Sequence, residues 1–92
     1  MIKVKLPYFI LSDINAEEDE DIYVEAKNIN DLYEVFETKY PEVTKKIFNE
    51  GKGVKNNVIL ALDESIIKKS NYDNVKFEDN QTLEILMQLS GG

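Results

Sequence analysis

The N-terminal part of the chain has two segments, residues 2–6 and 21–26, in which every second side chain is apolar. This period of two is typical of a β-strand with one buried face. Between them, residues 15–21 form an acidic run whose single apolar member is Ala16, which we interpret as a solvated turn. The pattern therefore predicts two strands that pair as an antiparallel hairpin.

The period changes to that of a helix at Asn28. The apolar positions that recur at helical spacing are Ile29, Leu32, Tyr33, Phe36 and Tyr40. They predict a helix with one buried face, and Asn30 is the residue that we expect to cap its N-terminus. Pro41 cannot continue this helix but suits the first position of another, so a short second helix is predicted over residues 42–49.

The C-terminal half returns to strand patterns. Residues 58–62 are continuously apolar, which predicts a third strand that is buried on both faces. Residues 63–65 predict a tight turn, residues 66–67 a short return strand, and residues 82–89 the final strand. In that last strand the apolar side chains of one face are Leu83, Ile85, Met87 and Leu89.

This order of elements has few compact solutions. A hairpin followed by a helix requires the later strands to join the same sheet, with the helix covering one face. The prediction is an α+β fold of the β-grasp (ubiquitin-like) type, a mixed sheet of four to five strands with one main helix and a short second helix. The last strand should run parallel to the first in the middle of the sheet. With 92 residues we expect a single domain, residues 1–92, with a C-terminal tail at residues 89–92.

Composition excludes several classes of function. Eighteen acids oppose eleven lysines and no arginine, so the net charge of −7 opposes binding to nucleic acid. The chain has neither His nor Cys, so it lacks the usual general base, the thiol nucleophile and the usual zinc ligands. Its acidic run lacks the ligand spacing of a calcium loop. We therefore expect no metal site and no enzyme acting by itself.

No apolar run approaches the ~20 residues that cross a bilayer, and the N-terminus alternates like a strand, unlike a signal peptide. We expect a cytoplasmic protein without a membrane partner.

The chain ends in Gln88-Leu89-Ser90-Gly91-Gly92, directly after the last predicted strand. A carboxylate is a poor electrophile and must be activated, typically as an acyl-adenylate, before a nucleophile can attack it. Glycine has no Cβ, so a terminal pair of glycines can pass through a narrow channel into another protein's active site. From Leu89 to Gly92 the extended reach is about 13 Å, at ~3.3 Å per residue. The terminus is suited to a carrier that is activated at Gly92.

The whole chain resembles the ubiquitin-like sulfur-carrier subunit of molybdopterin synthase, in the MoaD/ThiS family. The matching segments are residues 2–4, 40–43, 58–62 and 77–85, followed by Ser90-Gly91-Gly92. Two features depart from the family pattern. The prolines that often precede the terminal glycines are absent, and Leu62-Asp63-Glu64-Ser65 stands where an Asn-Gly turn is common.

The resemblance implies that Gly92 is adenylated and converted to a thiocarboxylate, which donates sulfur in molybdopterin (molybdenum or tungsten cofactor) biosynthesis. The chain itself would bind no cofactor. Its partners would be an ATP-dependent adenylyltransferase, similar to a ubiquitin-activating enzyme, and the large subunit of the synthase.

Three alternatives stay open. The first is a ubiquitin-like modifier that is joined through Gly92 to lysines. The second is a thiamine-type sulfur carrier, although those are shorter and generally lack the segment 40–55. The third is an interaction domain whose Gly-Gly end is incidental.

A carrier also needs a body surface that positions its tail, because two glycines offer too little area for specificity. The face of the sheet opposite the helix should be open, and Glu84, Leu86 and Gln88 should point there. We expect Leu86 and Gln88 to contact the partners. Phe9, in the apolar segment 8–11, is a further candidate contact.

Overall fold

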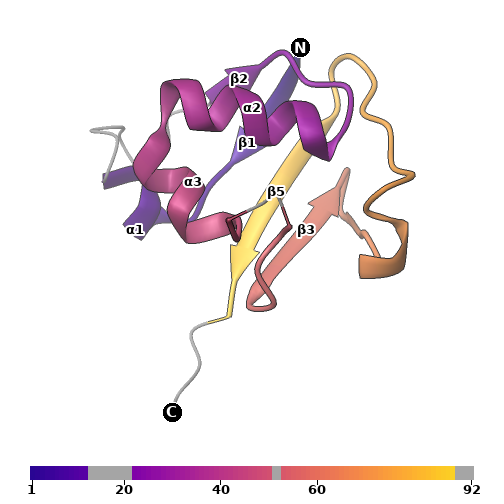
Figure 1. Cartoon of the computed structure of the whole chain (residues 1–92). Helices are drawn as coiled ribbons and strands as arrows, with labels where there is room; N and C mark the ends of the chain where they lie inside the picture. Colours follow the sequence, from indigo (N-terminus) through magenta and orange to yellow (C-terminus); the bar gives the residue numbers. More distant parts are fainter. Residues whose placement is uncertain (13–21, 51–52, 89–92) are drawn as a thin grey trace.

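The computed structural model describes residues 1–12, 22–50 and 53–88. Over these residues the N-terminal half contains strand β1 (Ile2–Lys5), helix α1 (Tyr8–Leu11), strand β2 (Ile22–Val24), helix α2 (Ile29–Lys39) and helix α3 (Pro41–Ile47). The C-terminal half contains strands β3 (Val58–Leu62) and β4 (Ser65–Ile66), the 3₁₀-helix η2 (Lys69–Asn71) and strand β5 (Thr82–Met87). Helices α2 and α3 lie in front of the sheet in Figure 1.

The described strands form one mixed sheet in the order β2-β1-β5-β3-β4. Strand β1 pairs with β2 in antiparallel orientation and with β5 in parallel orientation. On its other side β5 pairs antiparallel with β3, which forms a hairpin with β4. This confirms the predicted α+β, β-grasp architecture, including a last strand that runs parallel to the first in the middle of the sheet.

The N-terminal cap of α2 differs from the predicted one. Asn28, and not Asn30, is the N-cap, and its Oδ1 accepts a hydrogen bond of 2.8 Å from the backbone N–H of Asp31. The side chain of Asp31 adds a second bond, because its Oδ2 accepts a hydrogen bond of 3.1 Å from the backbone N–H of Lys27, the residue before the cap. With the helix starting two residues earlier, Ile29 enters the first turn and is buried against the core.

Helix α3 begins with Pro41 at its first position, as predicted, but ends at Ile47, two residues before the predicted end. Phe48 has extended backbone angles and forms a β-bridge to Val54, which draws the chain toward the sheet. Helix α1 was not expected. A single turn after Pro7 lets Ile10 and Leu11 reach the core.

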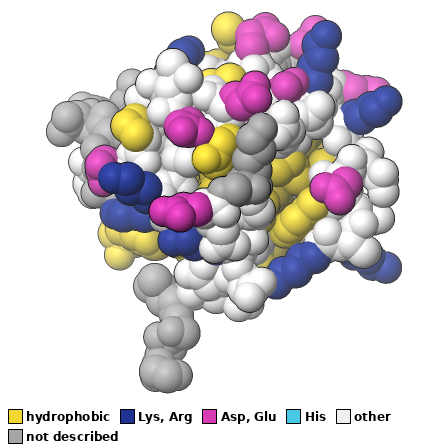
Figure 2. All heavy atoms as spheres, viewed as in Figure 1, with side chains coloured by type: hydrophobic (Ala, Val, Ile, Leu, Met, Phe, Trp, Pro, Cys, Tyr) yellow, Lys and Arg dark blue, Asp and Glu magenta, His cyan; other side chains and the backbone are white. Residues whose placement is uncertain are grey.

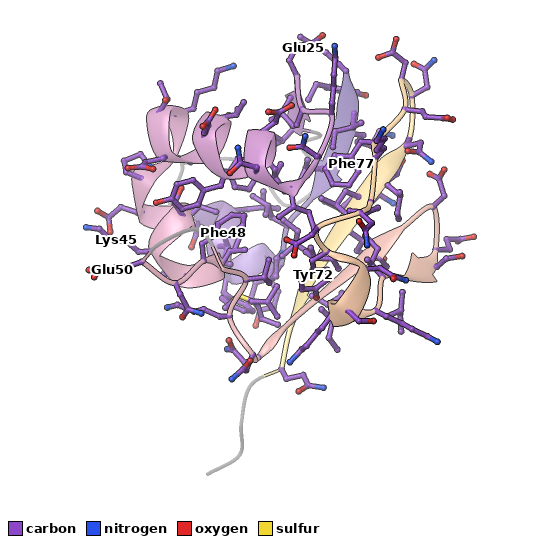
Figure 3. All side chains as sticks on the ribbon, turned by 45° about the vertical axis from the view of Figure 1, so that its right-hand side comes forward. Glu25, Lys45, Phe48, Glu50, Tyr72 and Phe77 are labelled. Atoms are coloured by element: carbon purple, nitrogen blue, oxygen red, sulfur yellow. The ribbon has the colours of Figure 1, made fainter. Side chains whose placement is uncertain are left out.

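The core fills the space between the helices and one face of the sheet. Phe48 and Phe77, from the segments after α3 and before β5, add buried rings to it (Figure 3). Its largest fully buried side chains are Ile2, Val4, Ile10, Val24, Leu32, Phe36, Val43, Ile47, Val58, Leu60, Leu83 and Ile85. Over the described residues, no helix has the length and apolar character that crossing a membrane requires.

The expectation that β3 is buried on both faces was wrong in part. Val58 and Leu60 are fully buried, whereas Ile59 is half-buried on the opposite face of the sheet. The reason is that α2 and α3 cover only one face (Figure 1).

Candidate functional site: the open face of the sheet

The register of the strands places an apolar row on the face opposite the helices. Leu86 of β5 lies opposite Ile59 of β3, and Ala61 of β3 lies opposite Ile66 of β4. Successive side chains of a strand point to opposite faces, and paired residues share a face. Since Leu60 and Ile85 are in the core, these four side chains belong to the other face. We call Ile59, Ala61, Ile66 and Leu86 the open-face patch.

The patch is partly exposed and has a charged border. Leu86 is 41% exposed and Ile66 is 70% exposed, above a half-buried Ile59 and a buried Ala61. Glu84 lies next to the patch on β5, where it is in register with both Ala61 and Lys5. Exposed apolar side chains with a polar rim are typical of a surface that contacts another protein.

Of the predicted partner contacts, Leu86 is the one that the structure places in β5 on this surface. Leu86 and Glu84 lie on the open face, as expected from the alternation of the strand. Gln88 is exposed just beyond the end of β5, and its backbone N–H donates a hydrogen bond of 2.7 Å to the carbonyl oxygen of Asn57. That bond holds the last described residue beside the start of β3. The predicted tail residues Leu89, Ser90, Gly91 and Gly92 lie outside the described residues.

Phe9, the other predicted contact, is half-buried and packs against the core. The exposed ring in helix α1 is that of Tyr8, which is 70% exposed and stacks edge-on against Phe9 with a centroid distance of 5.7 Å. The single helical turn directs Ile10 and Leu11 inward and leaves Tyr8 outside.

Ile59 and Ile66 were not singled out from the sequence, and Tyr8 was considered only as part of the apolar segment 8–11. For Ile59 a signal exists, because alternate members of the apolar run 58–62 must face opposite sides of the sheet. No comparable signal exists for Ile66, whose face depends on the register of the hairpin.

The described residues present a surface for contact. Among residues 1–12, 22–50 and 53–88, no group of three or more His, Cys, Asp or Glu is placed to hold a metal ion. The acidic run around residues 17–21 falls in a stretch that the structure does not describe.

Comparison with known proteins was made on sequence and on structure. No protein-family model matches the chain, and no curated protein matches it. Solved structures do match. A chain in the crystal structure of the Amycolatopsis orientalis BexX/CysO complex is similar with a TM-score of 0.81 and 14% identity, covering 100% of both chains.

Two archaeal structures are similar over almost their whole length. The small archaeal modifier protein 1 (SAMP1) of Methanosarcina acetivorans matches with a TM-score of 0.80 and 18% identity, over 99% of this chain and 95% of that one. A Pyrococcus furiosus protein assigned as subunit 1 of a molybdopterin converting factor matches with a TM-score of 0.64 and 18% identity, over 96% and 97% of the two chains. The chain thus has the ubiquitin-like β-grasp fold, which confirms, at the level of the fold, the resemblance found in the sequence.

Proposed function

We propose that the protein is a ubiquitin-like sulfur carrier that is activated at Gly92 and serves molybdopterin biosynthesis. The observation that carries the proposal is the position of the C-terminal segment: β5 ends beside the open-face patch, and the four residues after Gln88 end in two glycines. A partner that binds this face would receive a tail long enough to enter its active site. The similarity to the Pyrococcus furiosus molybdopterin converting factor subunit supports this pathway.

The chemistry requires two steps at the terminal carboxylate. A carboxylate oxygen of Gly92 attacks the α-phosphorus of ATP, which forms the acyl-adenylate and releases pyrophosphate. A sulfide-level sulfur donor supplied by a partner then attacks the acyl carbon and displaces AMP, which leaves a thiocarboxylate on Gly92. The chain supplies only its carboxylate and its docking surface, since it has no His or Cys for either step.

Two protein partners follow from this scheme. One is the ATP-dependent adenylyltransferase, and the other is the large synthase subunit that receives the sulfur. A similar fold crystallised in a complex with BexX supports the idea that such a body docks on a larger protein.

A second function is supported by a different neighbour. SAMP1 is named as a modifier, and a modifier would use the same adenylated Gly92 to form an amide bond with a lysine of another protein. Sulfur transfer and conjugation share the first step and differ in the nucleophile. A thiamine-type carrier would share both steps and differ only in the acceptor of the sulfur.

The decisive experiment is intact-mass spectrometry after incubation with a cognate adenylyltransferase, ATP and a sulfur donor. We expect the mass increase that replacing one oxygen by one sulfur requires. A variant that lacks Gly91 and Gly92 should show no increase yet unfold at the same temperature, because terminal glycines bury little apolar area. An unchanged mass with a demonstrably active partner would contradict the carrier function, and a stable amide with a lysine would favour the modifier.

Docking is tested separately by Leu86→Glu. Placing a charge in the open-face patch should weaken complex formation with either partner by roughly 1.5–3 kcal/mol, the scale for one buried apolar side chain. Titration calorimetry measures this, and circular dichroism checks that the variant stays folded. Tyr23→Glu is the matched control, because Tyr23 is 53% exposed on the same face but lies on β2, with β1 between it and β5.

If Leu86→Glu and Tyr23→Glu weaken binding equally, the patch has no special role. If Leu86→Glu folds and binds normally, docking lies elsewhere, and Tyr8 of helix α1 becomes the next candidate.

A further inference from the structure

A loop of three residues, 55–57, lies where the C-terminal segment leaves the body. Val58 of β3 is in register with Met87, the last residue of β5. The next pair in the same register is Asn57 and Gln88, and the backbone N–H of Gln88 donates a hydrogen bond of 2.7 Å to the carbonyl oxygen of Asn57. This bond continues the antiparallel ladder by one residue beyond the end of β5, and Figure 1 shows the two strand ends side by side.

The loop is itself held by the body. The N–H of Lys55 donates a hydrogen bond of 2.9 Å to the carbonyl oxygen of Ile47, the last residue of α3. The N–H of Val58 donates one of 3.1 Å to the carbonyl oxygen of Lys55, which closes the turn. Because Ile47 and Val58 are both fully buried, these two bonds fix the loop to the core.

A third contact with the loop comes from η2. The Nζ of Lys69 donates a hydrogen bond of 3.4 Å to the carbonyl oxygen of Asn56. In agreement with this bond, Figure 2 shows lysine side chains at the lower right of the molecule, where β3 begins and η2 lies in Figure 1. The end of a chain frays unless something ties it down, and here Gln88 bonds to a loop that α3, β3 and η2 hold in place.

We propose that Gln88 is a positioning residue for the reaction at Gly92 and that it acts through its backbone N–H, an inference that rests on the proposed function. The bond to Asn57 fixes the point and the direction in which the chain leaves the body. Gln88 is two residues beyond Leu86, so this point lies at the border of the open-face patch. A partner docked on the patch then receives the tail already aligned, and aligned groups react faster because their orientational entropy is lost before the reaction.

The bond is tested first in the free protein, by hydrogen exchange of the whole chain labelled with ¹⁵N. The side chain of Gln88 is exposed and β5 ends one residue before it. Its amide should nevertheless exchange about tenfold more slowly than in an unstructured peptide of the same sequence. Exchange as fast as in the peptide would overturn the proposal, and this result needs no partner protein.

The positioning role is tested with Gln88→Pro and Gln88→Ala. Proline removes the N–H, whereas alanine keeps it, and both remove the glutamine side chain, so their difference isolates the bond. At a saturating concentration of carrier, a cognate adenylyltransferase should adenylate Gln88→Pro about fivefold to thirtyfold more slowly than Gln88→Ala, the factor expected from freeing the backbone of one residue. The carrier concentration that gives half the maximal rate should be equal for the two variants, because both keep the open-face patch.

Two further variants separate alignment from docking. Replacing the amide between Met87 and Gln88 by an ester, in a chain assembled by chemical ligation, removes the N–H without adding a ring and should give the same loss of maximal rate. Leu86→Glu should instead raise the carrier concentration that gives half the maximal rate. Circular dichroism checks that each variant is folded.

Equal maximal rates for the proline and alanine variants would overturn the positioning role and leave the proposed function intact. A difference confined to the half-saturating concentration would also overturn it, since Gln88 would then act in docking. If the unaltered chain is not adenylated at all, the proposed function fails and the positioning role fails with it. The failures of the two proposals are therefore distinguishable.

Discussion

At the scale of single residues, the β3–β4 turn contains backbone strain. Asp63 and Glu64 have positive φ angles of 48° and 72°, in the left-handed region that disfavours residues with a Cβ. A two-residue hairpin loop requires this geometry, which is why Asn-Gly is common there. Asp63 compensates, because its Oδ1 accepts a hydrogen bond of 2.9 Å from the N–H of Thr82 and its Oδ2 accepts one of 3.2 Å from the Nε2 of Gln81. Glu64 has no such bond to any described residue.

This difference predicts opposite effects of glycine at the two positions. Glu64→Gly should raise the free energy of unfolding by about 0.5–1 kcal/mol, because the left-handed penalty exceeds the entropic cost of glycine. Asp63→Gly should lower it, because two hydrogen bonds to the start of β5 are lost. Urea denaturation of both variants measures the two changes in the free energy of unfolding. Destabilisation by Glu64→Gly would show that the Glu64 side chain contributes more than its strain costs.

At the scale of elements, α2 depends on its cap. The side chain of Asn28 accepts a hydrogen bond from the backbone N–H of Asp31, one of the N–H groups that the first turn leaves unpaired. The carboxylate of Asp31 accepts one from the backbone N–H of Lys27, just before the cap, and so fixes the entry of the chain into the helix. Asn30, inside the helix, makes no such bond to any residue that the structure describes. Since α2 covers the sheet with Leu32 and Phe36, its first turn supports the core directly.

Asn28→Ala should therefore lower the free energy of unfolding by about 0.5–2 kcal/mol, the usual loss for an N-cap. Asn30→Ala is the matched control and should change stability little, since alanine favours a helix interior. Chemical denaturation followed by circular dichroism distinguishes the two. Equal changes in the free energy of unfolding for the two variants would show that the Asn28 cap does not stabilise the helix.

At the scale of the whole molecule, hydrogen bonds join the N-terminus to the segment before β5. The Met1 ammonium donates a hydrogen bond of 2.7 Å to Oδ1 of Asp79, and the N–H of Asn80 donates one of 3.0 Å to the carbonyl oxygen of Met1. The hydrogen bond to Asp79 raises the pKa of the ammonium, with smaller help from the charges of Asp79 and Glu25. The same bond lowers the pKa of Asp79.

These two shifts define a pH window. The lowered pKa of Asp79 stabilises the fold above its unfolded value of 3.8, and this contribution is lost as pH falls through the folded pKa. The raised pKa of the ammonium stabilises the fold below its unfolded value of 8.0, and this contribution is lost as pH rises through the folded pKa. Thermal unfolding of the wild type and Asp79→Asn should therefore differ most between these values and converge beyond both ends.

The difference should be small and should shrink in salt, because both groups are exposed. Glu25→Gln is the control, since its carboxylate lies farther away, at 3.6 Å from the ammonium. A difference between wild type and Asp79→Asn that does not change with pH would contradict an ionic origin.

The order and type of the main elements could be predicted from the chain because they depend on local periodicity. Alternation in β1 and β2, helical spacing from Ile29 to Tyr40 and Pro41 at the start of α3 each act within a few residues. The parallel placement of β5 beside β1 followed from this order, since few topologies bury one helix on one sheet. Gly92 was identified by its chemistry in the sequence, and its role stays a prediction.

Tertiary structure alone decided which side chains of different strands combine into one exposed surface. The open-face patch exists because Leu86, twenty residues or more further along the chain, is brought into register with Ile59, Ala61 and Ile66 of the β3–β4 hairpin. A shift of one residue would exchange them with core residues, and the alternation within a single strand does not specify its partner's register. The cap at Asn28 was decided in the same way, by the burial of Ile29 against a sheet that local sequence does not contain.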